Sequence, residues 1–302
     1  MNTGYLNYNY AQSLAEFGTP IKLPKCGGWV LQRKIPGFPY YDAMGCYPLF
    51  CCEDWSLLYE DLNEIDSEWV SLSLVTDPFG DYDRSYLESC FKAIVLPFKQ
   101  HYIVDLHKPF REIISKNRRK KIRKALRSVN IEICEQPENH LEEWITLYSS
   151  LVEKHHITGI RAFSKAAFEK QLNIPGMVMF RALYQDKTIG ATLWYIQGEV
   201  GYGHLAAFNQ TGYELESSYA LDAFSMEYFS DKVQWLDLGG SAGTKRDQAD
   251  GLDLYKRGWA TETRPTYFCG RILDHDLYKN IVREKAMVET NYFPAYRIGE
   301  FE

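Results

Sequence analysis

Three strand-like segments follow one another without a helix between them, and this pattern constrains the fold more than any other feature of the chain. They are residues 177–184, 188–196 and 201–208, all rich in β-branched and aromatic side chains. Only Asp186-Lys187 and Gln197-Gly198 mark the breaks between them, which is enough chain for a hairpin turn and little else. Strands joined by hairpins pair antiparallel, so the sequence predicts an antiparallel meander here.

Helix-like segments surround this meander. Two precede it, at residues 138–155 and 164–172, the second with Ser164 as a candidate N-cap. A helix at 214–229, a strand at 233–238, a helix at 249–257 and a strand at 261–269 are predicted after it. The order helix, helix, three antiparallel strands, helix, strand, helix, strand resembles the topology of the GNAT (N-acyltransferase) fold.

The first half of the chain also mixes strands and helices. Strands are predicted at residues 68–76, 100–106 and 129–134, a helix at 82–92 and a long polar helix from Pro109 to about Ser128. A length of 302 residues favours two domains. We therefore expect a mixed α/β protein of two tandem GNAT-like lobes, residues 1–136 and 137–302, although no direct sequence repeat supports a duplication.

Composition narrows the class of protein. Hydrophobic residues make up 45% of the chain and its net charge is −6, which excludes a disordered chain and a strongly basic polyanion binder. Neither a long apolar run nor a signal-peptide pattern is present, so we expect a cytoplasmic protein without a membrane span. The seven cysteines are scattered without C-x-x-C spacing, which predicts reduced, mostly buried thiols and no metal site.

One segment departs sharply from this acidic average. Seven of the nine residues in 116–124 (KNRRKKIRK) are basic, and residues 108–127 hold ten Lys or Arg against one acid. Like charges four residues apart destabilise a helix, and a phosphate-bearing partner would relieve that repulsion. We predict that Arg118, Arg119 and Lys121 bind a phosphate-bearing substrate. A merely solvated helix face is the alternative.

Three stretches resemble a known family. VDLHKPFREIISKNRRKKIRKALRSVNIEI and LDLGGSAGTKRDQADGLDLYKRGW are similar to signatures of the Fem-type (FemAB-like) transferases of the GNAT superfamily, and the second is the more specific. YYDAMGCYPLF resembles a segment of relatives in surface-polysaccharide pathways. The resemblance implies transfer of an acyl or aminoacyl group, from a thioester or an aminoacyl-tRNA, to an amine of a cell-surface sugar or peptide precursor.

The second stretch also suggests where the chemistry takes place. Asp237 is predicted at the carboxyl end of a strand, where open α/β sheets bind ligands, and is a candidate catalytic residue. Gly239 and Gly240 permit close backbone approach and are candidate substrate-binding residues. A lysine matching Lys256 binds substrate or stabilises charge in Fem-type proteins. A helix-terminal cation without a catalytic role is the alternative for Lys256.

Acyl transfer to an amine needs a proton acceptor and a proton donor. His204, on the third strand of the meander, is the first candidate for the general base, because histidine titrates near neutral pH. Tyr255, beside Lys256, is the candidate donor to the leaving group, as the resemblance implies. Both residues also suit ordinary packing roles.

The donor is the least certain part of the prediction. GNAT enzymes that use acyl-CoA (acetyl-CoA) bind its pyrophosphate on amides of a loop after the third strand. Here that loop, residues 210–216, carries Glu214 and Glu216, which would repel a pyrophosphate. Our leading hypothesis is an N-acyltransferase, with acyl-CoA as the candidate cofactor. The alternatives are an aminoacyl-tRNA-dependent Fem-type enzyme and a non-catalytic GNAT-like protein that binds nucleic acid or a phosphorylated partner.

Overall fold

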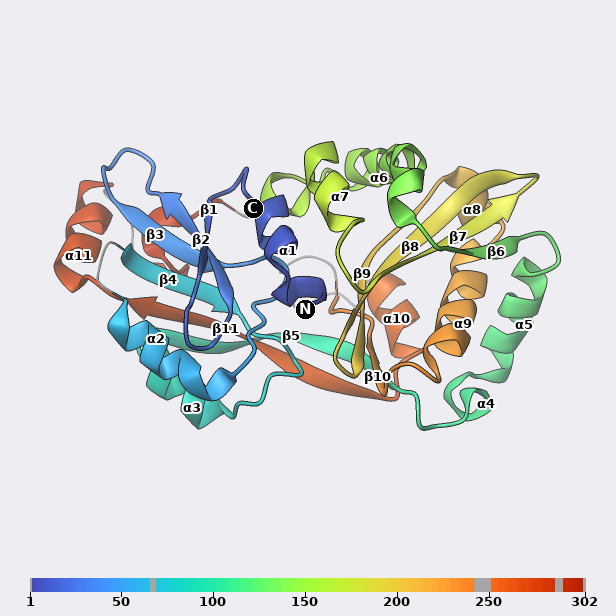
Figure 1. Cartoon of the computed structure of the whole chain (residues 1–302), viewed down its shortest axis with the longest axis horizontal. Coiled ribbons are helices and arrows are strands. Elements are labelled where there is room, and N and C mark those ends of the chain that lie inside the picture. Colours follow the sequence, from blue (N-terminus) through green and yellow to red (C-terminus); the bar gives the residue numbers. More distant parts are fainter. Residues whose placement is uncertain (1, 66–68, 242–250, 286–289, 301–302) are drawn as a thin grey trace. The chain divides into compact units, whose positions relative to one another are not determined.

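The computed structural model describes residues 2–65, 69–241, 251–285 and 290–300. Two compact units make up the chain, and each contains several segments (Figure 1). Unit 1 comprises Met1–Gly4, Lys99–Thr158 and Ser164–Arg264, and unit 2 comprises Tyr5–Phe98, Gly159–Phe163 and Pro265–Glu302. Residue 136 lies inside unit 1, so the compact units are not the two halves of the sequence on either side of it.

Unit 1 is built on a mixed sheet whose strand order is β5-β10-β9-β8-β7-β6. The pairs from β6 to β9 are antiparallel, β9 and β10 are parallel, and β10 and β5 are antiparallel. The strands are β5 (Ile94–Asp105, in this unit from Lys99), β6 (Asn130–Cys134), β7 (Met177–Tyr184), β8 (Lys187–Gln197), β9 (Val200–Phe208) and β10 (Trp235–Asp237). The predicted antiparallel meander is confirmed as β7 to β9.

Helices cover both faces of this sheet. They are α4 (Phe110–Ile113), α5 (Lys116–Ala125), η3 (Pro137–His140), α6 (Leu141–His155), α7 (Lys165–Gln171), α8 (Gln210–Glu214), α9 (Ser217–Phe229) and α10 (Gly251–Arg257). Both α6 and α9 contact β8, which is buried at every position from Ile189 to Tyr195. A strand buried on both faces needs a cover on each, so α6 and α9 lie on opposite sides. The α9 side holds a hydrophobic core that includes Phe180, Trp194, Phe229 and Trp259.

Unit 2 repeats part of this plan, with the strand order β1-β2-β3-β4-β11. Here β3 and β4 are parallel and the other pairs are antiparallel. The strands are β1 (Thr19–Lys22), β2 (Trp29–Lys34), β3 (Tyr41–Gly45), β4 (Trp69–Val75) and β11 (Glu262–Ile272, in this unit from Pro265). The helices are η1 (Gly4–Leu6), α1 (Tyr8–Ser13), η2 (Trp55–Leu57), α2 (Leu58–Glu64), α3 (Arg84–Cys90), η4 (Gly159–Arg161), α11 (His275–Glu284) and η5 (Ala295–Arg297). All seven cysteines of the chain are buried and unbridged, and four of them lie in the core of this unit.

Each unit takes a strand from the other half of the sequence. The first-half strand β5 pairs with β10 of unit 1, with Ile103 opposite Asp237. The second-half strand β11 pairs with β4 of unit 2, with Gly270 opposite Ser73. The final strand predicted for the second half is thus present but completes the other sheet, and this exchange explains why the units are not contiguous in sequence.

Two of the predicted helices are broken. The polar helix expected from Pro109 to Ser128 is interrupted at Ser115, whose hydroxyl caps the start of α5 by accepting from the Arg118 amide. The helix expected over 214–229 is divided into α8 and α9 by Glu216, which has a left-handed backbone with φ of 53°. The break at Glu216 turns its carboxylate toward Lys121 and Lys124 of α5.

Candidate active site at the end of strand β10

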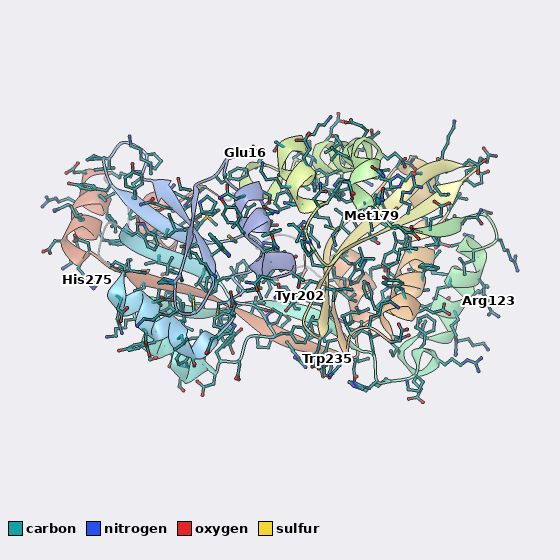
Figure 2. The ribbon with its side chains drawn as sticks, viewed as in Figure 1. Glu16, Arg123, Met179, Tyr202, Trp235 and His275 are labelled. Atoms are coloured by element: carbon teal, nitrogen blue, oxygen red, sulfur yellow. The ribbon has the colours of Figure 1, made fainter. Side chains whose placement is uncertain are left out.

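The parallel strands β9 and β10 stop pairing at the carboxyl end of β10. The last register pair is Asp237 opposite Tyr202, after which β10 ends while β9 continues to Phe208 (Figure 2 labels Tyr202). The adjacent loop, Leu238 to Ser241, therefore leaves the sheet at the carboxyl end of β10. Open α/β sheets bind ligands at such carboxyl ends, so this is the natural place for a site in unit 1.

Asp237 is buried at this strand end and holds the turn that follows. Its Oδ1 accepts from the Gly239 amide at 2.7 Å, and its Oδ2 lies 2.8 Å from Nδ1 of His101 on β5. Gly239 has φ of +76°, a conformation that favours glycine. The predicted position of Asp237 is confirmed, and the carboxylate orients the loop and His101. Its predicted catalytic role stays a prediction.

Two lysines donate to the backbone of this loop. Lys256 Nζ, from α10, lies 2.7 Å from the Gly240 carbonyl oxygen, and Lys99 Nζ, from β5, lies 2.9 Å from that of Ser241. Gly240 packs so closely on Lys99 that an added Cβ would lie 3.1 Å from that side chain. The predicted residues Gly239, Gly240 and Lys256 therefore come together, with two ammonium groups directed at one short loop.

Tyr255 and Asp222 form a polar pair beside Lys256. The Tyr255 hydroxyl donates to Asp222 Oδ2 at 2.6 Å, between α10 and α9. Burial raises the pKa of Asp222 to about 6, although the hydrogen bond from Tyr255 and the charges of Arg118 and Lys256 oppose the rise. Burial also raises the pKa of Tyr255. The pair is thus a hydroxyl donor joined to a carboxylate that exchanges its proton near neutral pH.

Arg118 packs inside unit 1 instead of facing solvent. Its Nη2 donates to the Tyr255 carbonyl oxygen at 2.6 Å, and its guanidinium lies over the rings of Trp259 and Tyr255 at 4.8 and 5.3 Å from their centroids. Burial lowers its pKa. Gly258 leaves the space for this side chain, since a Cβ there would lie 1.9 Å from Arg118 Nη2. In this structure the residue joins α5 to α10, and its predicted contact with substrate stays a prediction.

The other predicted cations of α5 differ from one another. Lys121 Nζ is 3.0 Å from Glu216 Oε1 and 3.2 Å from the Tyr219 hydroxyl. Burial disfavours the charged form of Glu216, but hydrogen bonds from Lys121 and Lys124 outweigh this and lower its pKa. Arg119 is exposed on the opposite side of the helix and lines a shallow hollow. Of the three predicted phosphate ligands, Arg119 is the most exposed, and the predicted phosphate binding by all three stays a prediction.

His204 lies on the other face of the sheet from Lys256 and Tyr255. Its Nε2 is 3.2 Å from Gln171 Oε1 on α7, and its ring packs on Tyr195. Burial lowers its pKa to about 3. A buried imidazole that stays neutral throughout the physiological range is a poor proton acceptor, so this environment does not support the predicted role as general base.

Sequence reasoning missed His101, Lys99 and Asp222. Asp222 carried a usable signal, because it is the acid within the otherwise apolar run ALDAF of α9. His101 carried none, because its partner Asp237 is 136 residues away in the chain. Among the residues that the structure describes, no three His, Cys, Asp or Glu side chains are grouped to bind a metal, and no helix is long and apolar enough to cross a membrane.

Comparison with solved structures identifies the fold. The chain superposes on FemX with a TM-score of 0.69 at 14% sequence identity, covering 93% of this chain and 95% of that one. The chain therefore has the fold of FemX over nearly its whole length.

Two further solved structures agree. The C-terminal domain (DUF2156) of a putative lysylphosphatidylglycerol synthetase from Agrobacterium fabrum gives a TM-score of 0.64 at 12% identity, over 92% of this chain and 91% of that one. L-PGS from Bacillus licheniformis gives 0.59 at 11% identity, over 94% and 98%. No protein-family model matches the sequence, and no curated protein is similar to it in sequence.

Proposed function

We propose that this protein is a transferase that passes an aminoacyl group from aminoacyl-tRNA to an amine of a cell-surface precursor. The observation that carries the proposal is that Lys256 and Lys99 donate to the glycine loop after β10, while the charge of Lys256 also acts on Asp222, the partner of Tyr255. FemAB-like folding over the whole chain, with FemX among the similar structures, supports this donor over a thioester.

The residues suit each step of such a transfer. The amine nitrogen attacks the ester carbonyl carbon, a C–N bond forms, and the carbonyl oxygen becomes an oxyanion. Lys256 supplies positive charge at the loop to stabilise this oxyanion or a phosphate of the donor. The amine gives its proton to the Tyr255 hydroxyl as that hydroxyl gives its own to Asp222. The ester C–O bond then breaks, and the ribose oxygen takes the proton back through Tyr255.

The acidity of Asp222 is suited to this role. A general base works best when its pKa is close to the operating pH. The value of about 6 for Asp222 lies within reach of neutrality, whereas that of about 3 for His204 does not. Asp222, which the sequence did not single out, therefore replaces His204 as our candidate for the base.

The loop before α9 argues against coenzyme A as the donor. Glu216 is the N-cap residue of α9, and its carboxylate is ion-paired with Lys121 and Lys124. A pyrophosphate at this helix terminus would have to displace that carboxylate. We expect free coenzyme A to bind with Kd no better than about 1 mM. Calorimetry measures this, and micromolar binding that is lost when residues 210–216 are changed would establish a thioester donor.

A direct assay separates the three hypotheses. Purified protein is incubated with a panel of amino-sugar nucleotides and lysine-containing peptides, and with either tRNA charged with radiolabelled amino acids or radiolabelled acetyl-CoA. The proposal expects label to move to an acceptor from aminoacyl-tRNA only, and to stay on the tRNA with Lys256→Ala. Transfer from acetyl-CoA alone would favour the N-acyltransferase. Transfer from neither, with tRNA still bound, would favour a non-catalytic binding protein.

A further inference from the structure

Helix α5 has an inner and an outer set of cations with different surroundings. The inner set, Arg118 and Lys121, is occupied by the Tyr255 carbonyl and by Glu216. The outer set, Lys116, Arg119 and Arg123, is exposed, and no acid in the described part of the chain forms an ion pair with it. Residues at spacings of three and four share one helix face, so these three side chains form a single positive stripe.

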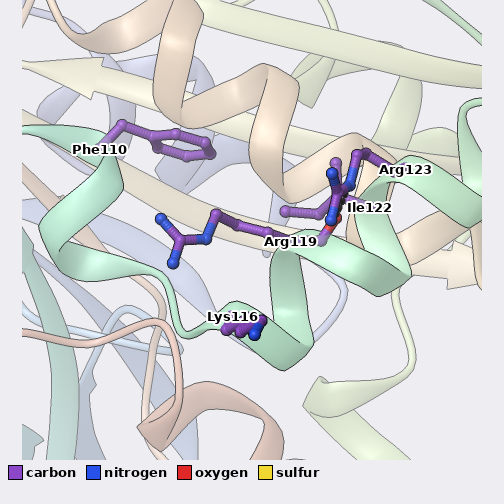
Figure 3. Close-up of a pocket in the computed structure, with 5 residues that line it drawn as sticks. All are labelled: Phe110, Lys116, Arg119, Ile122 and Arg123. Carbon is purple, nitrogen blue, oxygen red and sulfur yellow. Dashed lines mark hydrogen bonds between the residues drawn. The ribbon is translucent and has the colours of Figure 1, made fainter.

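An aromatic ring lies next to this stripe. Phe110 of α4, which is 37% exposed, lines a shallow hollow of about 480 Å³ together with Ile122 and the three outer cations (Figure 3). Figure 3 shows the Phe110 ring and the Arg119 side chain both directed into the space between α4 and α5. We call Phe110, Lys116, Arg119, Ile122 and Arg123 the α5 outer face.

Charge makes an anionic partner the natural occupant. Residues 108–127 carry a local charge of +9, within a chain whose net charge is −6. Like charges also repel one another along the helix at i,i+4 spacing. The outer cations Arg119 and Arg123 form one such pair, and Lys116 forms another with Lys120. An anion would remove this repulsion, and it has no carboxylate to displace from the outer face as it would have beside Lys121.

The combination of a cation stripe with one exposed ring is specific to a class of partner. Proteins hold single-stranded nucleic acid by tracking its phosphates with cations and stacking a base on an aromatic ring. A lipid headgroup would use the cations but leave Phe110, which lines the same hollow, without a role. The observations therefore favour a nucleic acid with an unpaired base.

We infer that the α5 outer face binds an unpaired segment of RNA, with its phosphates on Lys116, Arg119 and Arg123 and a base stacked on Phe110. The inference rests on the proposed function for the identity of the RNA as the donor tRNA. It also connects binding to the site, because Arg118 on the inner side of α5 holds the carbonyl end of α10, which carries Lys256.

Fluorescence anisotropy with a labelled single-stranded RNA of roughly 12 nucleotides, measured over a range of salt concentrations, tests the inference. The variant Lys116→Gln, Arg119→Gln, Arg123→Gln should bind at least about tenfold more weakly, with a log–log salt slope shallower by about 2. The control variant Lys34→Gln, Lys92→Gln, Lys279→Gln loses the same charge at exposed positions of unit 2 and should bind like wild type.

The stacked base gives a second, independent signal. Phe110→Ala should weaken binding of the single strand about fivefold or more without changing the salt slope, and should leave binding of the matching RNA duplex unchanged. The inference is overturned if the outer-face variant binds RNA within a factor of two of the control variant, which would make the face merely solvated. It is also overturned if the outer face is needed to bind vesicles of anionic phospholipid but not RNA.

Failure of this inference is distinguishable from failure of the proposed function. If transfer from aminoacyl-tRNA depends on Lys256 but is the same in the outer-face and control variants, the inference is wrong and the function stands. If RNA binding depends on the outer face while no amine accepts an aminoacyl group, the surface stands and the function is wrong. The Lys256→Ala variant should retain RNA binding through the outer face. Loss of RNA binding in this variant would contradict the inference.

Discussion

The two units share a strand plan but differ in what surrounds the end of the parallel strand. In each, a buried aspartate at that end accepts from the backbone amide two residues later: Asp237 from Gly239 at 2.7 Å in unit 1, and Asp77 from Phe79 at 3.0 Å in unit 2. The turn is therefore a property of the shared plan. It carries no functional information by itself.

The difference lies in the neighbours of each aspartate. In unit 2 Asp77 meets the Cys51 thiol at 3.4 Å, and the aromatic rings of Phe50, Trp55 and Tyr82 pack together nearby. In unit 1 the equivalent region holds a glycine loop and the ammonium groups of Lys99 and Lys256. One strand end is surrounded by aromatic core side chains and the other by two ammonium groups that donate to backbone carbonyls, and for this reason our proposal places the chemistry in unit 1.

The strongest test of this contrast is Lys256→Ala. Removing a charge that stabilises a developing oxyanion costs about 10²- to 10³-fold in rate, so transfer should fall by at least about a hundredfold. The melting temperature should stay close to that of wild type, because the side chain is only partly buried. Lys279→Ala, an exposed lysine of unit 2, is the matched control. Activity of Lys256→Ala within a factor of two of wild type would remove this lysine from the site.

The pH dependence of stability should also come from unit 1. His204 has a lowered pKa of about 3, so the folded state binds fewer protons there and stability rises with pH from about 3 to 6.5. Asp222 has a raised pKa of about 6, so its contribution falls as pH rises from about 4 to 6. The two slopes oppose one another in the same window, so these two groups together should contribute little net change of stability with pH.

Variants separate these slopes. Asp222→Asn should leave stability rising with pH between about 4 and 6, by on the order of 2 kcal/mol, and His204→Gln should leave it falling by a similar amount. Urea unfolding at several pH values measures both. If the two variants have the same slope, the opposition of these groups is refuted.

A paired substitution compares the two turns directly. Asp237→Asn and Asp77→Asn each keep an acceptor but remove its charge, and each should lower the free energy of unfolding by about 1–2 kcal/mol. Only Asp237→Asn should also reduce transfer per folded molecule, because it releases His101 and the loop held by Lys256. Equal activities in the two variants would show that the unit 1 turn is as purely structural as that of unit 2.

The smallest expected effect concerns the joint between α5 and α10. Gly258→Ala would expel Arg118 from its place, with the loss of one hydrogen bond and its cation–π contacts, at a cost of about 1 kcal/mol. In an Arg118→Ala background the same change should cost almost nothing. Gly251→Ala, where an added Cβ meets nothing within 4 Å, is the control. A full cost in both backgrounds would mean that Arg118 is not what Gly258 accommodates.

The local sequence pattern predicted most strands, and it predicted the helices whose N-cap residue is recognisable in the sequence. The meander β7 to β9 lies within a residue or two of its predicted bounds, because its turns use backbone that hairpins require, with positive φ at Gln185, Asp186 and Gly198. Ser164 caps α7 as expected. The sequence pattern could not predict the pairing of β5 with β10. Alternating apolar and polar residues indicate a strand but not the strand with which it pairs.

The site was predicted in part for the same reason. A motif singled out Lys256, Gly239 and Gly240, which lie together in the structure because all three belong to one stretch of chain, and their roles stay predictions. The charge run on α5 predicted how many cations the helix carries but not which way each one points, although helical spacing already separates Arg118 and Lys121 from Lys116 and Arg119. His204 shows the opposite limit, because a strand sequence does not report how deeply a histidine is buried.

The exchange of β5 and β11 between the halves has a consequence for folding. The sheet of unit 2 lacks its β11 edge until residue 272 has left the ribosome, although its other strands end at Val75. Such long sequence separations slow folding, because the chain loses conformational entropy before the stabilising contact forms. A partly synthesised chain would therefore expose the edge of β4 to other chains. Chaperones or rapid completion of the chain would have to protect that edge.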